Sequence, residues 1–164
     1  MSLPGRKLAG TLVLYFDGAS RGNPGPASYG VWSPAGLKDA RTLGSTTNNV
    51  AEWRGFLAAL DLALQAGAKD VEIRADSQLV LRQFSGEYRM KAPHLAGFLE
   101  EARRKASRIP RLSVVHVPRE ENHEADALAN GALDSALDAA RPRVGDVVRA
   151  ITAVVLERAP DGHD

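Results

Sequence analysis

The chain has 164 residues, of which 44% are hydrophobic and 25% charged, with a formal net charge of +1 and no cysteine. This length suffices for one domain with a buried core, and the composition argues against disorder. The missing cysteines exclude a disulfide framework and a thiolate metal site, and no apolar run reaches the roughly 20 residues of a membrane span. Residues 2–10 also lack the apolar stretch of a signal peptide, so we expect a cytoplasmic protein.

The first part of the chain predicts three short strands. Residues 11–16 are apolar and rich in β-formers, and they end at Asp17-Gly18. Residues 20–26 are crowded with Gly, Asn and Pro and predict a turn. Residues 27–33 and 37–43 then follow as strands, and we expect the three to pair antiparallel.

Helices and strands alternate after that. Apolar residues at helical spacing predict a helix that either Asn48 or Asn49 would cap and that Gly67 would end. The next expected elements are a strand over residues 70–75, helices over 77–84 and 93–107, and a strand over 112–117. This order predicts an α/β fold with a five-stranded mixed sheet, three antiparallel strands followed by two parallel ones, flanked by helices.

The clearest helical pattern lies at residues 122–140, where Ala and Leu form a stripe. Residues 147–158 fit either an apolar helix face or a strand, and their many β-branched residues favour the strand. We therefore expect a flexible N-terminus over residues 1–10, a main domain over 11–140, and an extension over 141–164 whose end is disordered.

Charge is distributed unevenly along the chain. Basic residues outnumber acidic ones between residues 82 and 119, whereas residues 120–140 contain acids but no Lys or Arg. Two solvated faces of opposite sign would explain this pattern. A phosphate-binding surface beside a cation-binding site would explain it equally well.

Four carboxylates fall where the predicted fold could bring them together. Asp17 and Asp76 end two strands, and Glu52 and Asp126 lie in the first turns of two helices. Ligands of such sheets gather at the carboxyl ends of the strands. Clustered carboxylates raise one another's pKa unless cations neutralise them, and ligands that are all oxygen suit Mg²⁺ or Mn²⁺. Two such ions about 4 Å apart can activate a water in phosphodiester cleavage.

Each acid also has an ordinary structural explanation. Asp17 fits an Asp-Gly turn, and Glu52 fits a capping box with Asn49. Asp76 fits a cap of the short helix, and Asp126 fits a first-turn acid favoured by the helix dipole. Their positions alone leave both explanations open.

The residues around the acids form four motifs. They are YFDGASRGNPGPA at residues 15–27, TTNNVAE at 46–52, ADSQ at 75–78 and NHEADALA at 122–129. In order and spacing they resemble the motifs of type 1 ribonuclease H, and the resemblance covers roughly residues 11 to 138. It implies a ribonuclease H-like fold and an endonuclease that cuts the RNA strand of RNA–DNA hybrids, leaving a 5′-phosphate and a 3′-hydroxyl. We expect the protein to be a monomer.

The resemblance also implies roles for individual residues. Two Mg²⁺ or Mn²⁺ ions would be held by Asp17, Glu52, Asp76 and Asp126. Contacts with the minor groove of the hybrid would come from Asn23, Asn48, Asn49 and Gln78, and Thr47 would lie near a phosphate pocket for the DNA strand. Amide side chains both donate and accept, which suits the 2′-hydroxyls that mark RNA. Helix capping is the alternative role for the paired Asn residues.

The chain departs from many family members in two places. The loop over residues 118–121 is short and carries Arg119 where many members carry a His, which resembles a subgroup common in archaea and some bacteria. Arg119 would assist phosphate binding or product departure electrostatically, because arginine stays protonated; a plain surface arginine is the alternative. His116 and His123 are not expected to be catalytic.

The second departure lies between Asp76 and the fifth strand, where the chain is too short for the extra basic helix of some members. Partial substitutes are Arg82, Arg89, Lys91, Arg103, Arg104 and Lys105. Three other functions stay open: a nuclease that also or mainly cuts double-stranded RNA, a catalytically silent nucleic-acid-binding domain, and a partner-binding fold that associates through residues 147–156.

Overall fold

The computed structural model describes residues 10–141 and 144–157. The strands are β1 (Leu12–Ser20), β2 (Gly25–Trp32), β3 (Lys38–Thr46), β4 (Asp70–Ala75) and β5 (Arg111–His116). The α-helices are α1 (Asn48–Gln65), α2 (Gln78–Ser85), α3 (Pro93–Ala106), α4 (His123–Ala140) and α5 (Val144–Glu157), and a short 3-10 helix, η1, spans Arg119–Glu121. None of the helices within the described ranges is long and apolar enough to cross a membrane.

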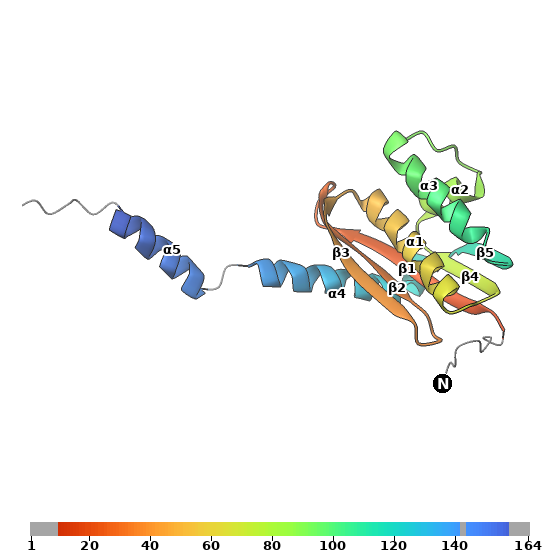
Figure 1. The fold of residues 1–164 in the computed structure, drawn as a ribbon, viewed down its shortest axis with the longest axis horizontal. Coiled ribbons are helices and arrows are strands. Elements are labelled where there is room, and N and C mark those ends of the chain that lie inside the picture. Colours follow the sequence, from red (N-terminus) through yellow and green to blue (C-terminus); the bar gives the residue numbers. More distant parts are fainter. Residues whose placement is uncertain (1–9, 142–143, 158–164) are drawn as a thin grey trace, which may run out of the picture. The chain divides into compact units, whose positions relative to one another are not determined.

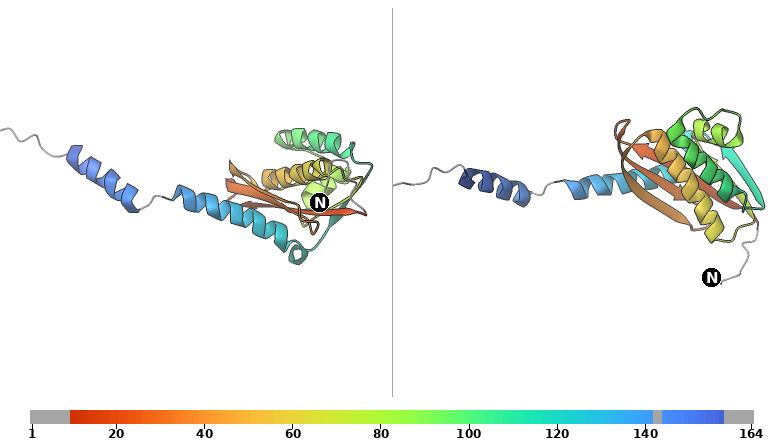
Figure 2. Two further views of the ribbon diagram at one scale, coloured as in Figure 1. Left: turned by 60° about the horizontal axis from the view of Figure 1, so that its bottom comes forward. Right: turned by 45° about the horizontal axis from the view of Figure 1, so that its top comes forward.

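The five strands form one mixed sheet in the order β3-β2-β1-β4-β5. The pairs β1–β2 and β2–β3 are antiparallel, and the pairs β1–β4 and β4–β5 are parallel. Helices α1 and α3 cover one face of the sheet, as Figures 1 and 2 show. This arrangement confirms the predicted fold class.

The main core lies between the sheet and α1. Alternate residues of β1, including Leu14 and Phe16, are fully buried against the face of α1 that carries Trp53 and Phe56. The rings of Phe16 and Phe56 stack with centroids 5.4 Å apart. Burial of each large apolar side chain stabilises the fold by roughly 1.5–3 kcal/mol. The residue that follows Phe16 is Asp17, so this core also fixes the position of the first acid.

Small residues bring the first part of α4 against the other face of the sheet. A Cβ added at Gly30 of β2 would lie 2.4 Å from the carbonyl oxygen of Ala125 and 2.6 Å from the amide of Ala129. The hydroxyl of Ser28 donates a hydrogen bond to the carbonyl oxygen of Ala129. The helix backbone therefore rests directly on β2, and this contact positions Asp126, which lies between the two alanines.

Three local predictions were wrong. Strand β1 continues past Asp17 to Ser20 because Asp17 and the residues after it pair with β2, so the expected turn over residues 20–26 shortens to four residues. Thr47 caps α1, in place of Asn48 or Asn49, since its Oγ1 accepts a hydrogen bond of 3.2 Å from the amide of Val50.

The third wrong prediction is the strand expected at residues 147–158. The segment up to Glu157 belongs to α5, whose apolar residues Val144, Val148 and Ile151 recur at helical spacing. The i, i+4 pattern outweighs the weak strand preference of β-branched residues. The predictions for residues 1–9 and 158–164 fall outside the described residues.

Residues 10–134 belong to one compact unit, and the described residues from 135 to 157 belong to a second. Helix α4 crosses the boundary between them. All four candidate acids belong to the first unit.

Candidate active site

Asp17 and Asp76 lie next to each other at the carboxyl edge of the parallel strands. Tyr15 of β1 is opposite Arg74 of β4 in the parallel register. Asp17 follows Tyr15 by two residues and Asp76 follows Arg74 by two residues, so the two aspartates lie side by side across this pair of strands. Asp17 is inside a strand paired with Gly30, and Ser77 rather than Asp76 caps α2. The turn and cap explanations for these two acids are therefore wrong.

Glu52 reaches the same edge because the start of α1 lies against β1. A Cβ at Gly18 would lie only 2.5 Å from the backbone nitrogen of Glu52, so glycine permits this approach. Two donors hold the Glu52 carboxylate: Nδ2 of Asn48 at 3.2 Å and the hydroxyl of Ser77 at 2.6 Å. Because Thr47 caps the helix, the expected capping box between Asn49 and Glu52 does not form.

Asp126 approaches from the first turn of α4. The residue just before this helix, Asn122, is 1% exposed and donates through Nδ2 to the carbonyl oxygen of Phe16 at 2.8 Å and to Oδ1 of Asp76 at 2.7 Å. Further along the helix, Nδ2 of Asn130 donates to Oδ1 of Asp126 at 3.0 Å. The strands that carry Asp17 and Asp76 are thus tied to the start of the helix that carries Asp126.

The electrostatics of Asp17 show that the four acids share one environment. Burial raises the pKa of Asp17 to about 9, assisted by a hydrogen bond with Asp126 and by the negative charges of Asp76, Asp126 and Glu52. Burial also raises the pKa of Glu52; the Asp76 charge acts in the same direction, and hydrogen bonds from Ser77 and Asn48 oppose it. Four carboxylates from four separate elements therefore influence one another, as the sequence predicts.

The donor set fits a hard divalent cation. Carboxylate and amide oxygens are the ligands that Mg²⁺ and Mn²⁺ prefer. Among the described residues, two buried side-chain oxygens lack a hydrogen-bond partner, Oδ1 of Asn49 and Oδ1 of Asn122. Asn49 lies in the first turn of α1, close to Glu52 in the sequence, and Asn122 contacts Asp76; an ion bound nearby is one explanation for such unpaired buried acceptors.

The carboxylates are not assembled as a finished coordination shell. In the described part of the chain, no group of three or more His, Cys, Asp or Glu side chains is arranged to hold a metal ion. In the absence of a cation, the raised pKa of Asp17 favours its protonated form. Metal binding would have to displace that proton.

The other expected site residues lie in three places. Asn23, in the β1–β2 loop, accepts a hydrogen bond of 3.0 Å at Oδ1 from the backbone nitrogen of Asn48. This contact brings the loop together with Thr47, Asn48 and Asn49 at the start of α1. Gln78 is exposed in the first turn of α2, next to Ser77.

Arg119 begins η1 and is exposed, and His116 at the end of β5 is exposed as well. His123 is exposed at the start of α4, where its Nε2 lies 2.7 Å from Oε1 of Glu124. Among the described residues, no hydrogen bond or ion pair joins either histidine to one of the four acids.

Sequence reasoning missed the side chains that hold the acids: Ser77, Asn122 and Asn130. Ser77 and Asn122 lie inside the quoted motifs, and Asn130 directly follows the last one, so their place in the sequence was the available signal. The acid that Ser77 holds is 25 residues away and the acid that Asn122 holds is 46 residues away, so spacing along the chain cannot reveal these contacts.

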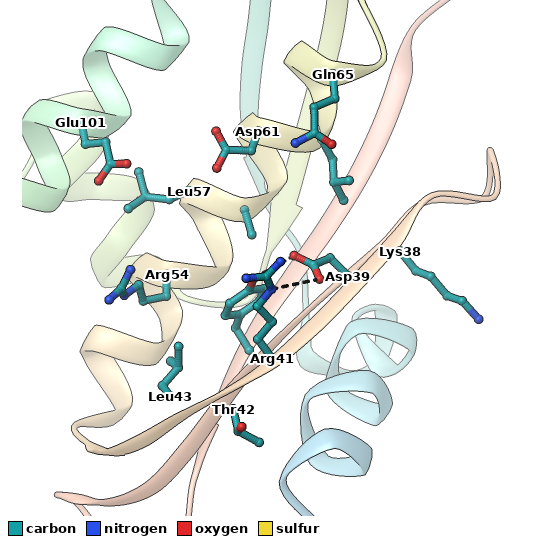
Figure 3. A pocket seen from close by; sticks show the side chains of 13 residues that line it. Lys38, Asp39, Arg41, Thr42, Leu43, Arg54, Leu57, Asp61, Gln65 and Glu101 are labelled. Carbon is teal, nitrogen blue, oxygen red and sulfur yellow. Dashed lines mark hydrogen bonds and ion pairs between the residues drawn. The ribbon is translucent and has the colours of Figure 1, made fainter. Parts of the chain in front are cut away.

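A pocket of about 540 Å³ lies elsewhere, between β3 and α1. Its lining carries charges of both signs, including Arg41, Arg54 and Asp61 (Figure 3). It contains none of the four acids, so we place the candidate site at the edge of the sheet and not in this pocket.

The five-stranded mixed sheet with its flanking helices is the fold of the ribonuclease H structures that match this chain. A family model described as "Reverse transcriptase-like" matches residues 35–132. Among solved structures, ribonuclease H1 of Halobacterium salinarum is 44% identical, with a TM-score of 0.74 over 77% of this chain and 99% of that one. LC11-RNase H1 in complex with an RNA/DNA hybrid is 40% identical, with a TM-score of 0.71 over 77% of this chain and 99% of that one. The chain belongs to the ribonuclease H family.

Two curated relatives are longer than the matched region. A ribonuclease HI of Halobacterium salinarum is 45% identical over 132 residues, which are 77% of this chain and 66% of that protein. The bifunctional protein Rv2228c of Mycobacterium tuberculosis is 43% identical over 135 residues, 79% of this chain and 37% of that protein. The match thus spans between about one third and two thirds of these relatives.

Proposed function

We propose that this chain is an endonuclease that hydrolyses the RNA strand of RNA–DNA hybrids with the help of divalent cations. The observation that carries the proposal is the convergence of four acids from four separate segments. Asn122 and Ser77 fix Asp76 and Glu52, and the charges of Glu52, Asp76 and Asp126 all act on the pKa of Asp17. Perturbed carboxylates at one edge of a sheet are typical of catalytic sites. The hybrid bound to LC11-RNase H1, a relative of 40% identity, supports the choice of substrate.

The cations would be two Mg²⁺ or Mn²⁺ ions, held by Asp17, Glu52, Asp76 and Asp126. Such ions, when bound, lower the pKa of a water and stabilise the charge of the departing oxygen. Hydrolysis in this manner would leave a 5′-phosphate and a 3′-hydroxyl.

The role of the chain itself is to hold these acids in place. Asn122 fixes Oδ1 of Asp76, while Ser77 and Asn48 fix the two oxygens of Glu52. Donors of this kind keep a carboxylate oriented as a ligand, and their loss typically costs 10–100-fold in metal affinity or activity. Asp17 is only partly exposed, and partial burial strengthens electrostatic interactions with its carboxylate relative to open water.

Recognition of the hybrid would fall to the amides and hydroxyls beside the acids. The contact between Asn23 and the backbone of Asn48 brings the β1–β2 loop to the start of α1. Asn49 and Gln78 would add further contacts to 2′-hydroxyls in the minor groove, and Thr47 would lie near a phosphate of the DNA strand. Gln78 is exposed and free to meet a ligand, whereas Thr47 also serves as the helix cap.

Arg119 would act after or during cleavage. Arg119 is exposed on the short connection between β5 and α4. Asn122 belongs to the same connection. A permanent positive charge there would attract a phosphate of the RNA strand or assist its departure. This arrangement resembles the short-loop subgroup of the family, in which an arginine stands where other members have a histidine.

A substrate panel tests the proposal. Purified protein is incubated with end-labelled RNA–DNA hybrid, double-stranded RNA and double-stranded DNA, each with Mg²⁺, with Mn²⁺ or with a chelator. We expect cleavage of the RNA strand of the hybrid, only with an ion present, and products that a 5′-phosphate-dependent exonuclease degrades. Faster cleavage of double-stranded RNA would contradict the substrate, and undiminished cleavage with the chelator would contradict the role of the cations.

A further inference from the structure

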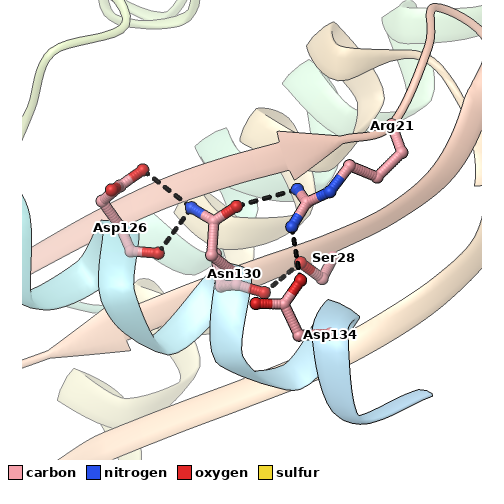
Figure 4. A network of polar contacts seen from close by, with 6 residues as sticks. Arg21, Ser28, Asp126, Asn130 and Asp134 are labelled. Atoms are coloured by element: carbon pink, nitrogen blue, oxygen red, sulfur yellow. Dashed lines mark hydrogen bonds and ion pairs between the residues drawn. The ribbon is translucent and has the colours of Figure 1, made fainter. Parts of the chain in front are cut away.

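Asn130, which holds Asp126, is the centre of a chain of contacts that reaches the β1–β2 loop. Its Nδ2 donates to both the main-chain oxygen of Asp126 at 2.9 Å and its Oδ1 at 3.0 Å. Its Oδ1 accepts from Nη1 of Arg21 at 2.8 Å. Arg21 belongs to the β1–β2 loop, and Figure 4 shows its guanidinium between Asn130 and Asp134.

The guanidinium of Arg21, together with the two oxygens of Asp126, fixes which way the Asn130 amide points. Rotation of an asparagine amide by 180° exchanges the positions of its oxygen and its nitrogen. Arginine only donates, so Oδ1 must face Arg21 and Nδ2 must face Asp126. Asp134 fixes the arginine in turn, because its Oδ1 lies 2.6 Å from Nη2.

Stability alone gives little reason for this arrangement. The side chains of Arg21 and Asp134 are 40% and 62% exposed, and exposed ion pairs contribute little to folding. The contact does, however, join two parts of the site that are 109 residues apart in the sequence. One is the loop that carries Asn23, and the other is the helix that carries Asp126.

We propose that Arg21 and Asn130 are positioning residues: Arg21 orients the Asn130 amide, which holds the Asp126 carboxylate as a metal ligand and couples it to the β1–β2 loop. The inference rests on the proposed function, in which Asp126 binds a divalent cation. Neither residue touches the reacting phosphate. Both act through Asp126, so their loss affects the cation first and the hybrid second.

The test measures Mg²⁺ affinity by isothermal titration calorimetry in the absence of substrate, and kcat and KM for hybrid cleavage over a range of Mg²⁺ concentrations. The variants are Asn130→Ala, Asn130→Asp, Arg21→Gln and the double variant Arg21→Gln/Asn130→Ala. Arg111→Gln is the matched control, since Arg111 also pairs with one aspartate, Asp70 at 3.3 Å, but lies at the opposite end of β5 from the acids.

We expect Asn130→Ala to weaken Mg²⁺ binding about 10–100-fold and to lower kcat, with little change in KM. Asn130→Asp keeps the size of the side chain but loses the donor and adds a like charge, so it should weaken Mg²⁺ binding at least as much. Arg21→Gln should have a smaller effect in the same direction and almost none in the Asn130→Ala background, because the arginine acts through the amide. Arg111→Gln should match the parent.

Several results would overturn the inference. Unchanged Mg²⁺ affinity in folded Asn130→Ala or Arg21→Gln would do so, and so would an effect of Arg21→Gln on KM alone, which would make Arg21 a substrate contact. If Asn130→Ala does not fold, Arg21→Gln gives the same test from an exposed loop. A parent chain that binds Mg²⁺ but cuts no hybrid contradicts the proposed function, while the affinities of the variants still decide the coupling. A parent chain that binds no Mg²⁺ overturns both.

Discussion

The buried amide of Asn122 donates a hydrogen bond of 2.7 Å to Oδ1 of Asp76, and the same nitrogen also donates to the carbonyl oxygen of Phe16. One side chain therefore ties the start of α4 to the middle of β1 and to the residue that follows β4. Asp17 directly follows Phe16, so the contact bears on two of the four acids at once.

Replacement of Asn122 should affect both stability and activity. In Asn122→Ala the carbonyl oxygen of Phe16 loses its side-chain donor, which we expect to lower the free energy of unfolding by about 1–3 kcal/mol. The loosened Asp76 should lower the cleavage rate about 10–100-fold. Urea denaturation and hybrid cleavage at a temperature where the variant is folded measure the two effects.

Gln83 provides the control for this prediction. It is another buried amide, and it accepts a hydrogen bond of 3.3 Å from Nε1 of Trp53 and not from a group that holds an acid. Gln83→Leu should reduce stability without reducing the cleavage rate of the folded protein. A normal rate in folded Asn122→Ala would show that Asp76 does not need this donor.

The pKa of Asp17 predicts how stability depends on pH without divalent cations. The folded chain keeps the Asp17 proton up to about pH 9, whereas the unfolded chain releases it near the ordinary value of 3.8. Between these values the folded state binds more protons, so the contribution of Asp17 to stability is fully present at low pH and is lost as the pH rises. Asp17→Asn removes this dependence and should raise the Tm at pH 8 in a chelating buffer by on the order of 5 °C.

Thermal unfolding of the parent and Asp17→Asn from pH 5 to pH 9 checks this prediction. The two Tm curves should diverge as the pH rises, and Mg²⁺ should raise the Tm of the parent more than that of the variant. Parallel curves would mean that Asp17 carries no raised pKa.

The Ser77 hydroxyl has two roles, and two different replacements should show what each role contributes. Its hydroxyl donates to Oε2 of Glu52 at 2.6 Å and caps α2. Ser77→Ala should lose about 0.5–2 kcal/mol from the missing cap and cleave about tenfold more slowly at low Mg²⁺. Ser77→Thr keeps the hydroxyl and should stay close to the parent in both measurements. An equal loss in the two variants would assign the effect to packing and not to the hydroxyl.

Gly30 tests the contact between β2 and α4. A methyl group there would overlap the backbone at Ala125 and Ala129, so Gly30→Ala should destabilise the protein by about 1–3 kcal/mol and displace Asp126. Gly97 in α3 has no atom within 4 Å of an added Cβ. Gly97→Ala should therefore be neutral or stabilising by up to about 1 kcal/mol, with normal activity. Chemical denaturation of both variants measures the difference, and equal stabilities would show that α4 can shift away without cost.

The periodicity of apolar residues was enough to predict the sheet and its helices. Strand β4 begins and ends at the predicted residues, because buried Val71, Ile73 and Ala75 alternate with polar residues, as in a strand with one face in the core. Strand β1 was predicted too short because its last residues, Gly18 to Ser20, are small and resemble a turn. Their pairing with β2 depends on residues that follow later in the chain.

The four acids could be predicted because their motifs are long and specific. The groups that orient them could not, because each contact joins residues far apart in the sequence, such as Asn122 and Phe16. The cap of α1 was assigned to an asparagine, although Thr47, Asn48 and Asn49 are all good caps and only the backbone geometry selects Thr47. In α5, helical spacing and strand propensity conflicted, and spacing prevailed.

Cleavage of a labelled RNA–DNA hybrid by the parent chain and by Asp76→Asn, under saturating Mg²⁺, measures most directly whether the carboxylates of this edge carry the chemistry. The amide is of nearly the same size as the carboxyl, so circular dichroism and the Tm should show an intact fold. We predict that the variant loses several orders of magnitude in rate. Equal rates in the two proteins would contradict the assignment of Asp76 and, with it, the account of the site.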